Sequence, residues 1–212
     1  VTADDSTSTF ALLPNVAIYG GYSEDFGARD PETNITILSG DIDQNDAVNA
    51  EGVVTDPANG LSESNADHVV TAGSSTDATT ILDGLTITAG YASSLQGTGG
   101  GIMVQSPITI RDVRFVGNRV GDEGGAMYVR ADATLTDVVF EHNQADYGGG
   151  GAVSALFASP TFLRVTFREN IVINGDGGAF YGGAYQGSVG PMFRDVVVEN
   201  NNAGDPNDSD VG

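Results

Sequence analysis

Short strings in which hydrophobic and polar residues alternate recur along this chain about every 25 residues. The first clear string carries Val113 and Phe115 two positions apart and ends at Asn118. β-branched and polar residues fill the positions between them, which is typical of a half-buried strand. Strings of the same spacing end at Asn143, Asn170 and, in a weaker form, Asn201, and a degenerate one ends at Gly90. The pattern predicts one strand per repeat at this position.

A second string, two glycines followed by a short hydrophobic stretch, lies between successive copies of the first. Its copies begin at Gly100, Gly124, Gly150 and Gly177. A further glycine, Gly99, precedes the first pair. The stretches after the glycines also predict strands, and the Gly, Asn and Asp residues between the two strings favour turns. No segment has a convincing 3.6-residue hydrophobic period, so the chain is expected to be all-β.

A repeat of this length made only of strands and turns cannot bury its own hydrophobic face, so the repeats must stack as a solenoid. A propeller blade requires roughly 40 residues, which exceeds the period. Leucine-rich repeats share the spacing of the hydrophobic residues and the asparagine. They place a helix or 3₁₀ segment, however, where this chain has Gly-Gly and a strand. The pattern favours a parallel β-helix of about 6–7 coils.

Stacked coils of a β-helix bring equivalent residues over one another about 4.8 Å apart. We therefore expect three phenylalanines to stack inside the helix. Four asparagines are expected to form a ladder in which each amide bonds to the backbone of the next coil. The two sets are Phe115, Phe140 and Phe167, and Asn118, Asn143, Asn170 and Asn201.

The Phe-x-x-Asn and Gly-Gly-Ala strings resemble the repeats of chlamydial polymorphic outer-membrane proteins and related bacterial surface proteins. The matching positions are Phe115 with Asn118, Phe140 with Asn143, Phe167 with Asn170, and the strings that start at Gly124, Gly150 and Gly177. The upstream segments 16–22, 34–41 and 81–88 resemble the first part of large secreted bacterial proteins with this repeat. The resemblance covers most of residues 10–202. It implies a right-handed parallel β-helix that is extracellular, either secreted or at the bacterial outer membrane, in an adhesin-like or cell-surface setting.

The whole chain, residues 1–212, is expected to form a single β-helix module. Residues 1–67 lack a clean repeat and predict irregular first coils followed by a long loop that begins at residue 41. Residues 68–202 carry the regular coils, and residues 203–212 have the composition of a linker. Because no amphipathic helix caps either end, we interpret the module as a fragment of a longer solenoid.

Charge and composition narrow the classes of partner. The chain has 29 acidic residues against eight basic ones, a formal net charge of −21. So few cations argue against nucleic acid and anionic membrane surfaces as partners. The absence of cysteine excludes a disulfide scaffold, and the hydrophobic runs are too short for a transmembrane segment. We attribute the negative charge to solvation of the outer wall. Like charges along the wall discourage sideways association, which favours contacts through the coil ends.

One column of charged residues is a candidate catalytic site. Alignment of the repeats places Asp112, Asp137, Arg164 and Asp195 above one another. Neighbouring carboxylates would lie about 5 Å apart, near the separation in a retaining glycosidase. However, the coil spacing imposes that distance on any stacked pair, and catalytic carboxylates need unlike environments whereas these look alike. The motif sets of pectate lyases and polygalacturonase-like hydrolases are absent.

A calcium site is a second candidate. Asp41, Asp43 and Asn45 alternate oxygen donors as a calcium loop does, with Glu51 as a further ligand. The sixth position is Asp46 instead of Gly and the twelfth is not Glu, so an EF-hand is excluded. A looser oxygen cage and a plain turn rich in Asp and Asn remain the two interpretations.

Two tyrosines are candidates for carbohydrate binding. If the alternate residues of the Gly-Gly strands point inward, then Tyr128 and Tyr181 point outward with Ser154 between them. Such a pair would form a stacking platform for a sugar, although isolated exposed aromatics are ordinary on protein surfaces. With only His68 and His142 in the chain, a histidine-based zinc site is not expected.

These observations favour a non-catalytic extracellular or cell-surface module that acts as an adhesin-like stalk or as a structural or assembly element. Expected partners are host-cell or matrix glycans or proteins, or copies of the chain itself through the coil ends. No cofactor is implied beyond calcium. Two alternatives remain: a polysaccharide-active lyase or glycosidase with a carboxylate cleft along the helix, and a calcium-stabilised extracellular scaffold.

Overall fold

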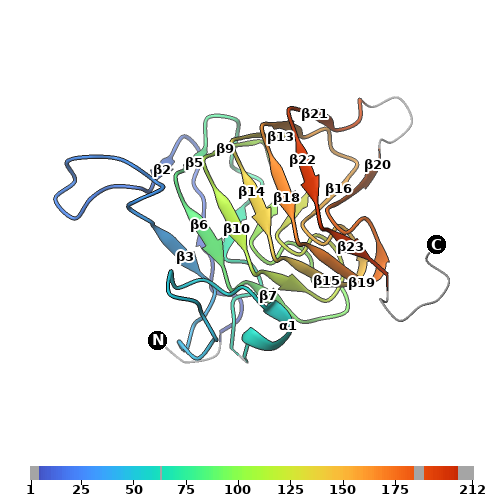
Figure 1. Ribbon diagram of the computed structural model, residues 1–212. Coiled ribbons are helices and arrows are strands. Elements are labelled where there is room, and N and C mark those ends of the chain that lie inside the picture. Colours follow the sequence, from blue (N-terminus) through green and yellow to red (C-terminus); the bar gives the residue numbers. More distant parts are fainter. Residues whose placement is uncertain (1–4, 63, 184–188, 205–212) are drawn as a thin grey trace.

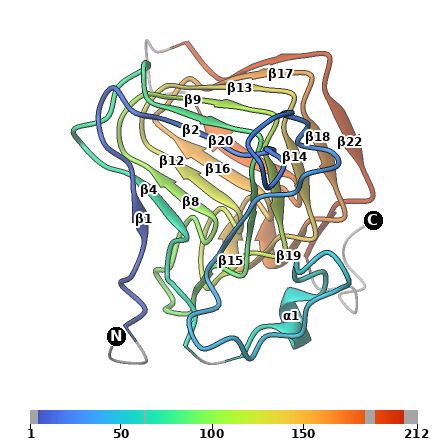
Figure 2. The same cartoon turned by 90° about the vertical axis from the view of Figure 1, so that its left-hand side faces the viewer.

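Parallel strands wind around a common axis from one end of the molecule to the other (Figure 1). This computed structural model describes residues 5–62, 64–183 and 189–204. Figure 2 looks along the axis from the N-terminal end, where the chain rises on the left, crosses the top and descends on the right while it moves away from the viewer. The predicted all-β, right-handed parallel β-helix is therefore confirmed. The described residues contain one short helix, α1 (Pro57–Gly60).

Four sheets run along the helix, named here I to IV in the order in which the chain passes through them. Sheet I contains β1 (Phe10–Ala11), β4 (Val70–Ala72), β8 (Ile102–Val104), β12 (Met127–Val129), β16 (Val153–Leu156) and β20 (Phe180–Gly183). Sheet II contains β2 (Ala17–Tyr19), β5 (Ile81–Asp83), β9 (Ile108–Arg111), β13 (Ala133–Thr136), β17 (Thr161–Leu163) and β21 (Met192–Arg194). Sheet III contains β3 (Ile37–Ser39), β6 (Thr86–Thr88), β10 (Arg114–Val116), β14 (Val139–Glu141), β18 (Thr166–Arg168) and β22 (Val197–Glu199). Sheet IV contains β7 (Tyr91–Ala92), β11 (Arg119–Val120), β15 (Gln144–Gly149), β19 (Ile171–Asp176) and β23 (Asn202–Ala203).

Each complete coil takes one strand from every sheet. Four coils are complete within the described residues: β4–β7, β8–β11, β12–β15 and β16–β19. The first coil has only β1–β3, because the chain leaves the helix after β3 instead of forming a strand in sheet IV. The last coil, β20–β23, includes residues 184–188, which lie outside the described part. The predicted number of six to seven coils is therefore slightly too high.

Stacked aromatic rings fill the interior of the regular coils. Phe115 pairs in register with Phe140, and Phe140 with Phe167. Their ring centroids are 5.0 and 5.1 Å apart, with the planes within 9° of parallel. All three side chains are buried. Identical residues at one position of each coil thus produce a continuous column of stacked rings along the axis.

The chain turns a corner between sheets II and III, just before each Phe-x-x-Asn string. One residue of the corner adopts a positive φ, and the valine that follows it points into the core. Asp112 has φ of 48° and Asp137 of 55°, while the side chains of Val113 and Val138 are fully buried. Asp tolerates the left-handed conformation better than most residues do, which favours it at such a corner.

Buried asparagines line the corner between sheets III and IV. The Oδ1 of Asn170 accepts hydrogen bonds from the backbone N–H and the Nδ2 of Asn143, at 3.1 and 3.0 Å. The Nδ2 of Asn170 in turn donates to the carbonyl of Phe140, at 3.0 Å. Asn201 repeats this arrangement one coil further on. Asn118 accepts from the backbone N–H of Gly90 and donates to the carbonyl of Ile87. Each side chain therefore satisfies backbone groups of the preceding coil that the corner leaves unpaired.

Residues 41–62 and 64–67, here called the strap, cross the outside of the corner between sheets III and IV before the chain re-enters the helix. Val53 and Val54 of the strap are buried, and the backbone N–H of Val54 donates to Oγ1 of Thr88. A Cβ on Gly117 would lie 2.0 Å from the carbonyl oxygen of Val54. The strap therefore packs directly on the backbone of the β-helix at Gly117, where a side chain would leave no room for it.

The two ends of the helix differ. At the N-terminal end, the loop that connects β2 to β3 (residues 20–36, here called the N-terminal loop) extends away from the coils (Figure 1). At the C-terminal end, side chains of the last coil are exposed, with Phe193 at 45 % and Val198 at 62 %. Among the described residues, no helix has the length and apolar character needed to cross a membrane.

Candidate functional site: a carboxylate groove on the outer wall

A groove of about 620 Å³ lies on the outer wall, between the N-terminal loop and the corner that joins sheets II and III. Asp30 and Glu32 of the loop line one side, and Asp112, Asp137 and Arg164 of the corner line the other. The groove therefore contains two members of the carboxylate column that the repeat alignment predicts, together with two acids from a segment that carries no repeat.

The corner positions lie directly over one another because each backbone bonds to the next coil. The N–H of Asp112 donates to the carbonyl of Thr136, and the N–H of Asp137 donates to that of Leu163, both at 3.1 Å. Coils of a β-helix are stacked about 4.8 Å apart, so Asp112 and Asp137 project side by side into the groove.

Asp137 is held by a cation from the next coil. Its two carboxylate oxygens accept hydrogen bonds from Nε and Nη2 of Arg164, at 2.6 and 2.7 Å. These bonds lower the pKa of Asp137 below its usual value. The same contacts raise the pKa of Arg164. The pair is a two-bond fork that keeps Asp137 ionised.

Asp112 has a different environment. No cation forms an ion pair with its carboxylate among the residues the structure describes. Partial burial raises the pKa of Asp112, and the neighbouring charges of Asp83 and Asp137 add to the rise. The sequence-based expectation that the acids of this column have alike environments is wrong: one is paired and the other is not.

The N-terminal loop is anchored at the N-terminal end of the column of corner positions that contains Asp112 and Asp137. Arg29 forms an ion pair with Asp83, donates from Nε to the carbonyl of Gly20 at 2.9 Å, and stacks over the ring of Tyr19 at 5.6 Å. A Cβ on Gly84, the first member of the column, would lie 2.4 Å from Nη2 of Arg29. A glycine at this position therefore makes room for the arginine that anchors the loop.

The third aspartate of the column lies apart from the groove. Asp195 is 67 % exposed and its nearest cation is the adjacent Arg194, at 3.6 Å. The structure therefore brings together Asp112 and Asp137 of the three candidate catalytic residues. Chemically, the pair combines a carboxyl with a raised pKa and an ionised carboxylate, which is the asymmetry of a glycosidase dyad. Both oxygens of Asp137 are engaged by Arg164, however, and this lowers its power as a nucleophile.

Three of the four candidate calcium ligands lie in one turn. Asp41 accepts hydrogen bonds from the backbone N–H groups of Asn45 and Asp46, at 3.1 and 3.2 Å, and Asp43 accepts one from Nδ2 of Asn45 at 2.7 Å. Glu51 points elsewhere, toward Nη1 of Arg114 at 3.3 Å. Within the described residues, no group of three acidic or histidine side chains is placed to hold a metal ion.

Asp46, the residue that departs from the EF-hand pattern, joins two separate segments of the strap. It accepts hydrogen bonds from the N–H of Ser62 at 2.7 Å and from Nδ2 of Asn65 at 2.6 Å. Burial raises its pKa, and these two hydrogen bonds oppose the rise. The sequence could not predict the contacts of Asp46 with Ser62 and Asn65, because no repeat relates these residues.

The two candidate sugar-binding tyrosines lie on the outer face of sheet I. Tyr128 pairs in register with Ser154, and Ser154 with Tyr181. Tyr181 is 36 % exposed, but Ser154 is fully buried and donates to Oε2 of Glu123 at 3.1 Å. Burial, and then the charge of Glu123, raise the pKa of Tyr128. The two tyrosines therefore lie on either side of a buried contact between Ser154 and Glu123, and the surface between them is not exposed for a sugar to stack on.

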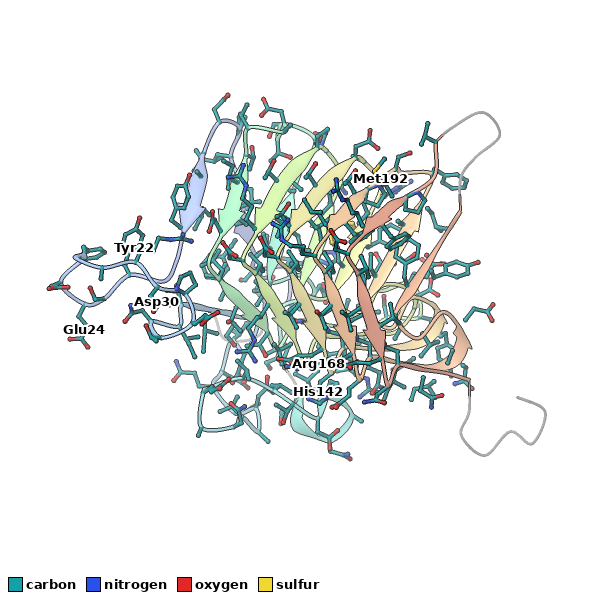
Figure 3. All side chains as sticks on the ribbon, turned by 45° about the horizontal axis from the view of Figure 1, so that its top comes forward. Tyr22, Glu24, Asp30, His142, Arg168 and Met192 are labelled. Carbon is teal, nitrogen blue, oxygen red and sulfur yellow. The ribbon has the colours of Figure 1, made fainter. Side chains whose placement is uncertain are left out.

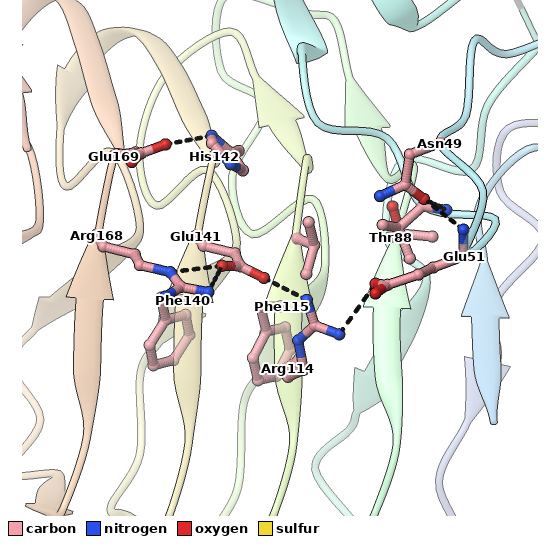
Figure 4. Close-up of polar contacts among 12 residues, drawn as sticks. Asn49, Glu51, Thr88, Arg114, Phe115, Phe140, Glu141, His142, Arg168 and Glu169 are labelled. Atoms are coloured by element: carbon pink, nitrogen blue, oxygen red, sulfur yellow. Dashed lines mark hydrogen bonds and ion pairs between the residues drawn. The ribbon is translucent and has the colours of Figure 1, made fainter. Parts of the chain in front are cut away.

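A buried glutamate on the wall of sheet III escaped the sequence reasoning. Glu141 bridges Arg114 and Arg168 of the two adjacent coils, and Arg114 also contacts Glu51 of the strap (Figure 4). Burial opposes ionisation of Glu141, but the hydrogen bonds from the two arginines outweigh it and lower its pKa. The repeat register could have revealed this network, since Glu141 pairs with Arg168 one coil on. Figure 3 shows His142 next to Arg168 on this wall, where Nδ1 of His142 lies 3.3 Å from Oε2 of Glu169.

Comparison with known proteins gives one result for this chain. Residues 137–156 match the Chlamydia polymorphic membrane protein repeat. This segment starts at the groove residue Asp137 and contains the string from Phe140 to Asn143 and the Gly-Gly-Ala string that begins at Gly150. No curated protein and no solved structure matches the chain. The resemblance of the repeats to that family is thus confirmed over residues 137–156, on a parallel β-solenoid.

Proposed function

We propose that this protein is a non-catalytic β-helix module of a bacterial surface, which acts as an adhesin-like stalk or assembly element. Its expected partners are glycans or proteins of a host cell or matrix. The observation that carries the proposal is the match of residues 137–156 to a repeat of chlamydial membrane proteins, set in a helix with a continuous internal ladder.

The internal ladder suits a stalk for a physical reason. Buried asparagines bond each coil to the next, and stacked phenylalanines fill the space beside them. Bending such a rod would break several buried hydrogen bonds at once, each costing about 1–3 kcal/mol when a partner is left unsatisfied. A rigid rod holds a distal surface away from the cell.

The outer wall suits a binding role better than catalysis. It carries acidic residues, and the described cations on it are largely paired with carboxylates, as Arg114, Arg119 and Arg164 show. Tyr181 and Tyr147 are exposed at 36 and 48 % and offer aromatic faces to a sugar ring.

A binding assay combined with a cleavage assay tests this function. Purified protein is applied to arrays of glycans and matrix proteins, and every bound glycan is also incubated in solution and analysed for released oligosaccharide. We expect saturable binding without release. Tyr181→Ala and Tyr147→Ala, which each remove one of the two exposed aromatic faces, should weaken binding of a glycan. Leu95→Ala, at an exposed position without an aromatic ring, is the control and should bind like the parent. Release of oligosaccharide by the purified protein would overturn the proposal.

Antibody labelling tests the proposed location. Antibodies raised against the purified protein should label intact source cells without permeabilisation. Labelling that appears only after permeabilisation would contradict a surface location, whatever the binding assay gives.

A polysaccharide-active enzyme is the second candidate, and the unlike pair in the groove favours it. Asp112 with its raised pKa would serve as the acid and the ionised Asp137 as its partner. Under this function, oligosaccharide release would be lost in Asp112→Asn and in Asp137→Asn. It would persist in Asp195→Asn, whose side chain lies outside the groove.

A further inference from the structure

The groove between the N-terminal loop and the outer wall has apolar residues as well as acids in its lining. Pro31 and Ile35 of the loop, together with Val113 and Val139 of the wall, line its space of about 620 Å³. The wall of the groove belongs to the coils β8–β11, β12–β15 and β16–β19, which have further coils on either side. The groove therefore lies on the side of the helix and not at an open end. Sites that bind ligands combine such apolar surface with a few converging polar groups.

One carboxylate in this groove lacks the cation that the acids on either side of it have. Arg164 reaches back from the next coil to Asp137, and Arg29 reaches from the loop to Asp83. Asp112 lies between these two pairs and forms no ion pair among the described residues. Burial raises the pKa of Asp112, and the charges of Asp83 and Asp137 add to the rise. A cation placed beside Asp112 would therefore relieve an unfavourable negative charge.

The N-terminal loop supplies two further acids to the same groove. Asp30 and Glu32 line its other side, and neither carboxylate forms an ion pair within the part of the chain that the structure describes. Oδ1 of Asp30 accepts a hydrogen bond from the backbone N–H of Glu32 at 3.1 Å, which holds the turn that carries both acids. Figure 3 shows Asp30 nearer to the coils than Glu24 of the same loop. Acids therefore lie on both sides of the apolar lining.

The two arginines of the groove have other carboxylate partners. Arg164 forms the two-bond fork with Asp137, and Arg114 pairs with Glu51 and Glu141. An occupant that neutralises the remaining acids must therefore bring its own positive charge. A second copy of this chain does not meet this need, because it has a formal net charge of −21 and no lysine.

We propose that the groove binds a basic segment of a partner protein, with a lysine or arginine side chain along the apolar lining and its charged end between Asp112 and Glu32. Both kinds of side chain have an aliphatic stem that packs on apolar surface while the cation stays at the polar edge. The negative charge of the whole chain attracts such a segment at long range, and the groove determines where it docks. The inference rests on the proposed binding role and identifies the chemistry of the protein partner.

Binding of a fluorescently labelled oligolysine peptide to the purified protein tests the proposal. Fluorescence anisotropy is measured at about 0.15 M salt, where charges more than about 8 Å apart are largely screened. Binding to the parent should be saturable, with one peptide bound per chain. Asp112→Asn and Glu32→Gln should each raise the dissociation constant about three- to tenfold. Ile35→Ser should also raise it, because the stem of the bound side chain loses apolar contact.

Asp195→Asn is the matched control. Asp195 has the same corner position as Asp112, with a φ of 54°, but does not line the groove. The variant removes the same charge and should bind oligolysine like the parent. Circular dichroism confirms that each variant is folded. An equal loss of binding in Asp195→Asn and Asp112→Asn shows only a general attraction to an acidic wall and overturns the proposal, as does the absence of saturable binding.

Oligomers of chitosan, which carry amines on sugar rings, separate the two classes of cationic partner. Saturable binding of these oligomers that Asp112→Asn weakens, without binding of oligolysine, overturns the assignment to a protein segment. Absence of oligolysine binding by a protein that binds glycans or matrix proteins and labels intact cells overturns this inference alone. Loss of those two properties, with oligolysine still bound in the groove, overturns the proposed function alone.

Discussion

Asn143 accepts two hydrogen bonds from Asn118 through a single oxygen. Its Oδ1 lies 3.1 Å from the backbone nitrogen and 3.0 Å from the Nδ2 of Asn118 in the preceding coil. Its own Nδ2 donates to the carbonyl of Phe115 at 2.9 Å. One buried side chain thus satisfies three polar groups of the neighbouring coil.

Replacement of this asparagine is expected to be strongly destabilising. Asn143→Ala leaves the buried N–H of Asn118 without its acceptor and removes the amide that donates to the carbonyl of Phe115. At about 1–3 kcal/mol for each such group, we expect a loss of about 3–5 kcal/mol in the free energy of unfolding. Urea denaturation measures it. Asn174→Ala, at an exposed position of β19, should change the same quantity by less than about 0.5 kcal/mol. A similar small change for both variants would contradict the role of the ladder.

The glycine pairs are expected to be intolerant of any side chain at their second position. A Cβ on Gly125 would lie 2.2 Å from the carbonyl oxygen of Gly151 and 2.6 Å from that of Gln144. Because both contacts are with backbone, the coils would have to move apart, and we expect Gly125→Ala to cost about 3 kcal/mol or more. Gly73→Ala, where no heavy atom lies within 4 Å, is the control. Thermal denaturation of the two variants side by side decides whether close approach of the coils explains the Gly-Gly string.

The sequence predicts the regular coils because every coil repeats the same physical problem. Alternation places Phe140 inward, and the constant period brings equivalent residues into register, so the all-β parallel helix follows from spacing alone. The course of the strap and of the N-terminal loop has no such basis, because their partners are far away in sequence. Glu51 meets Arg114, and Arg29 meets Asp83, through contacts that no repeat relates.

The candidate site was predictable only in part for the same reason. Alignment of the repeats places Asp112 and Asp137 in one column. Their unlike environments arise from Arg164 one coil away and from the approach of the N-terminal loop. Likewise, the register places Ser154 between two tyrosines, but its burial depends on Glu123 in the preceding coil. Tertiary neighbours, which the pattern does not encode, therefore determine the chemistry of each column.

Glu51 is expected to stabilise the strap through Arg114 and without a metal ion. Glu51→Gln removes the ion pair with Arg114. Both side chains of this pair are partly exposed, so we expect the free energy of unfolding to fall by about 0.2–1 kcal/mol. Thermal unfolding in calcium chloride and in EDTA checks the cause. The loss should be equal in the two solutions, and the parent should show no calcium-dependent rise in Tm. A rise in Tm that Glu51→Gln abolishes would support the calcium-stabilised scaffold instead.

The two groove aspartates are expected to affect stability in opposite directions as pH changes. The pKa of Asp112 is raised in the folded protein by burial and by the charges of Asp83 and Asp137. A carboxyl with a raised folded pKa destabilises the fold once it ionises, so its cost is absent below the ordinary value of 3.8 and complete above the folded value. Asp112→Asn should therefore be more stable than the parent at pH 7, with the gain vanishing near pH 3.

Asp137 gives the opposite sign, because its hydrogen bonds with Arg164 lower its pKa. Its stabilising contribution is complete above the ordinary value of 3.8 and is lost as the pH falls through the lower folded value. Asp137→Asn should therefore be less stable than the parent at pH 7, and the difference should shrink toward pH 2. Urea denaturation of the parent and both variants at several pH values between 2 and 7 measures the two curves. Curves that shift in the same direction would show that the two carboxyls have alike environments after all, and would remove the structural basis for an acid and an ionised partner in this groove.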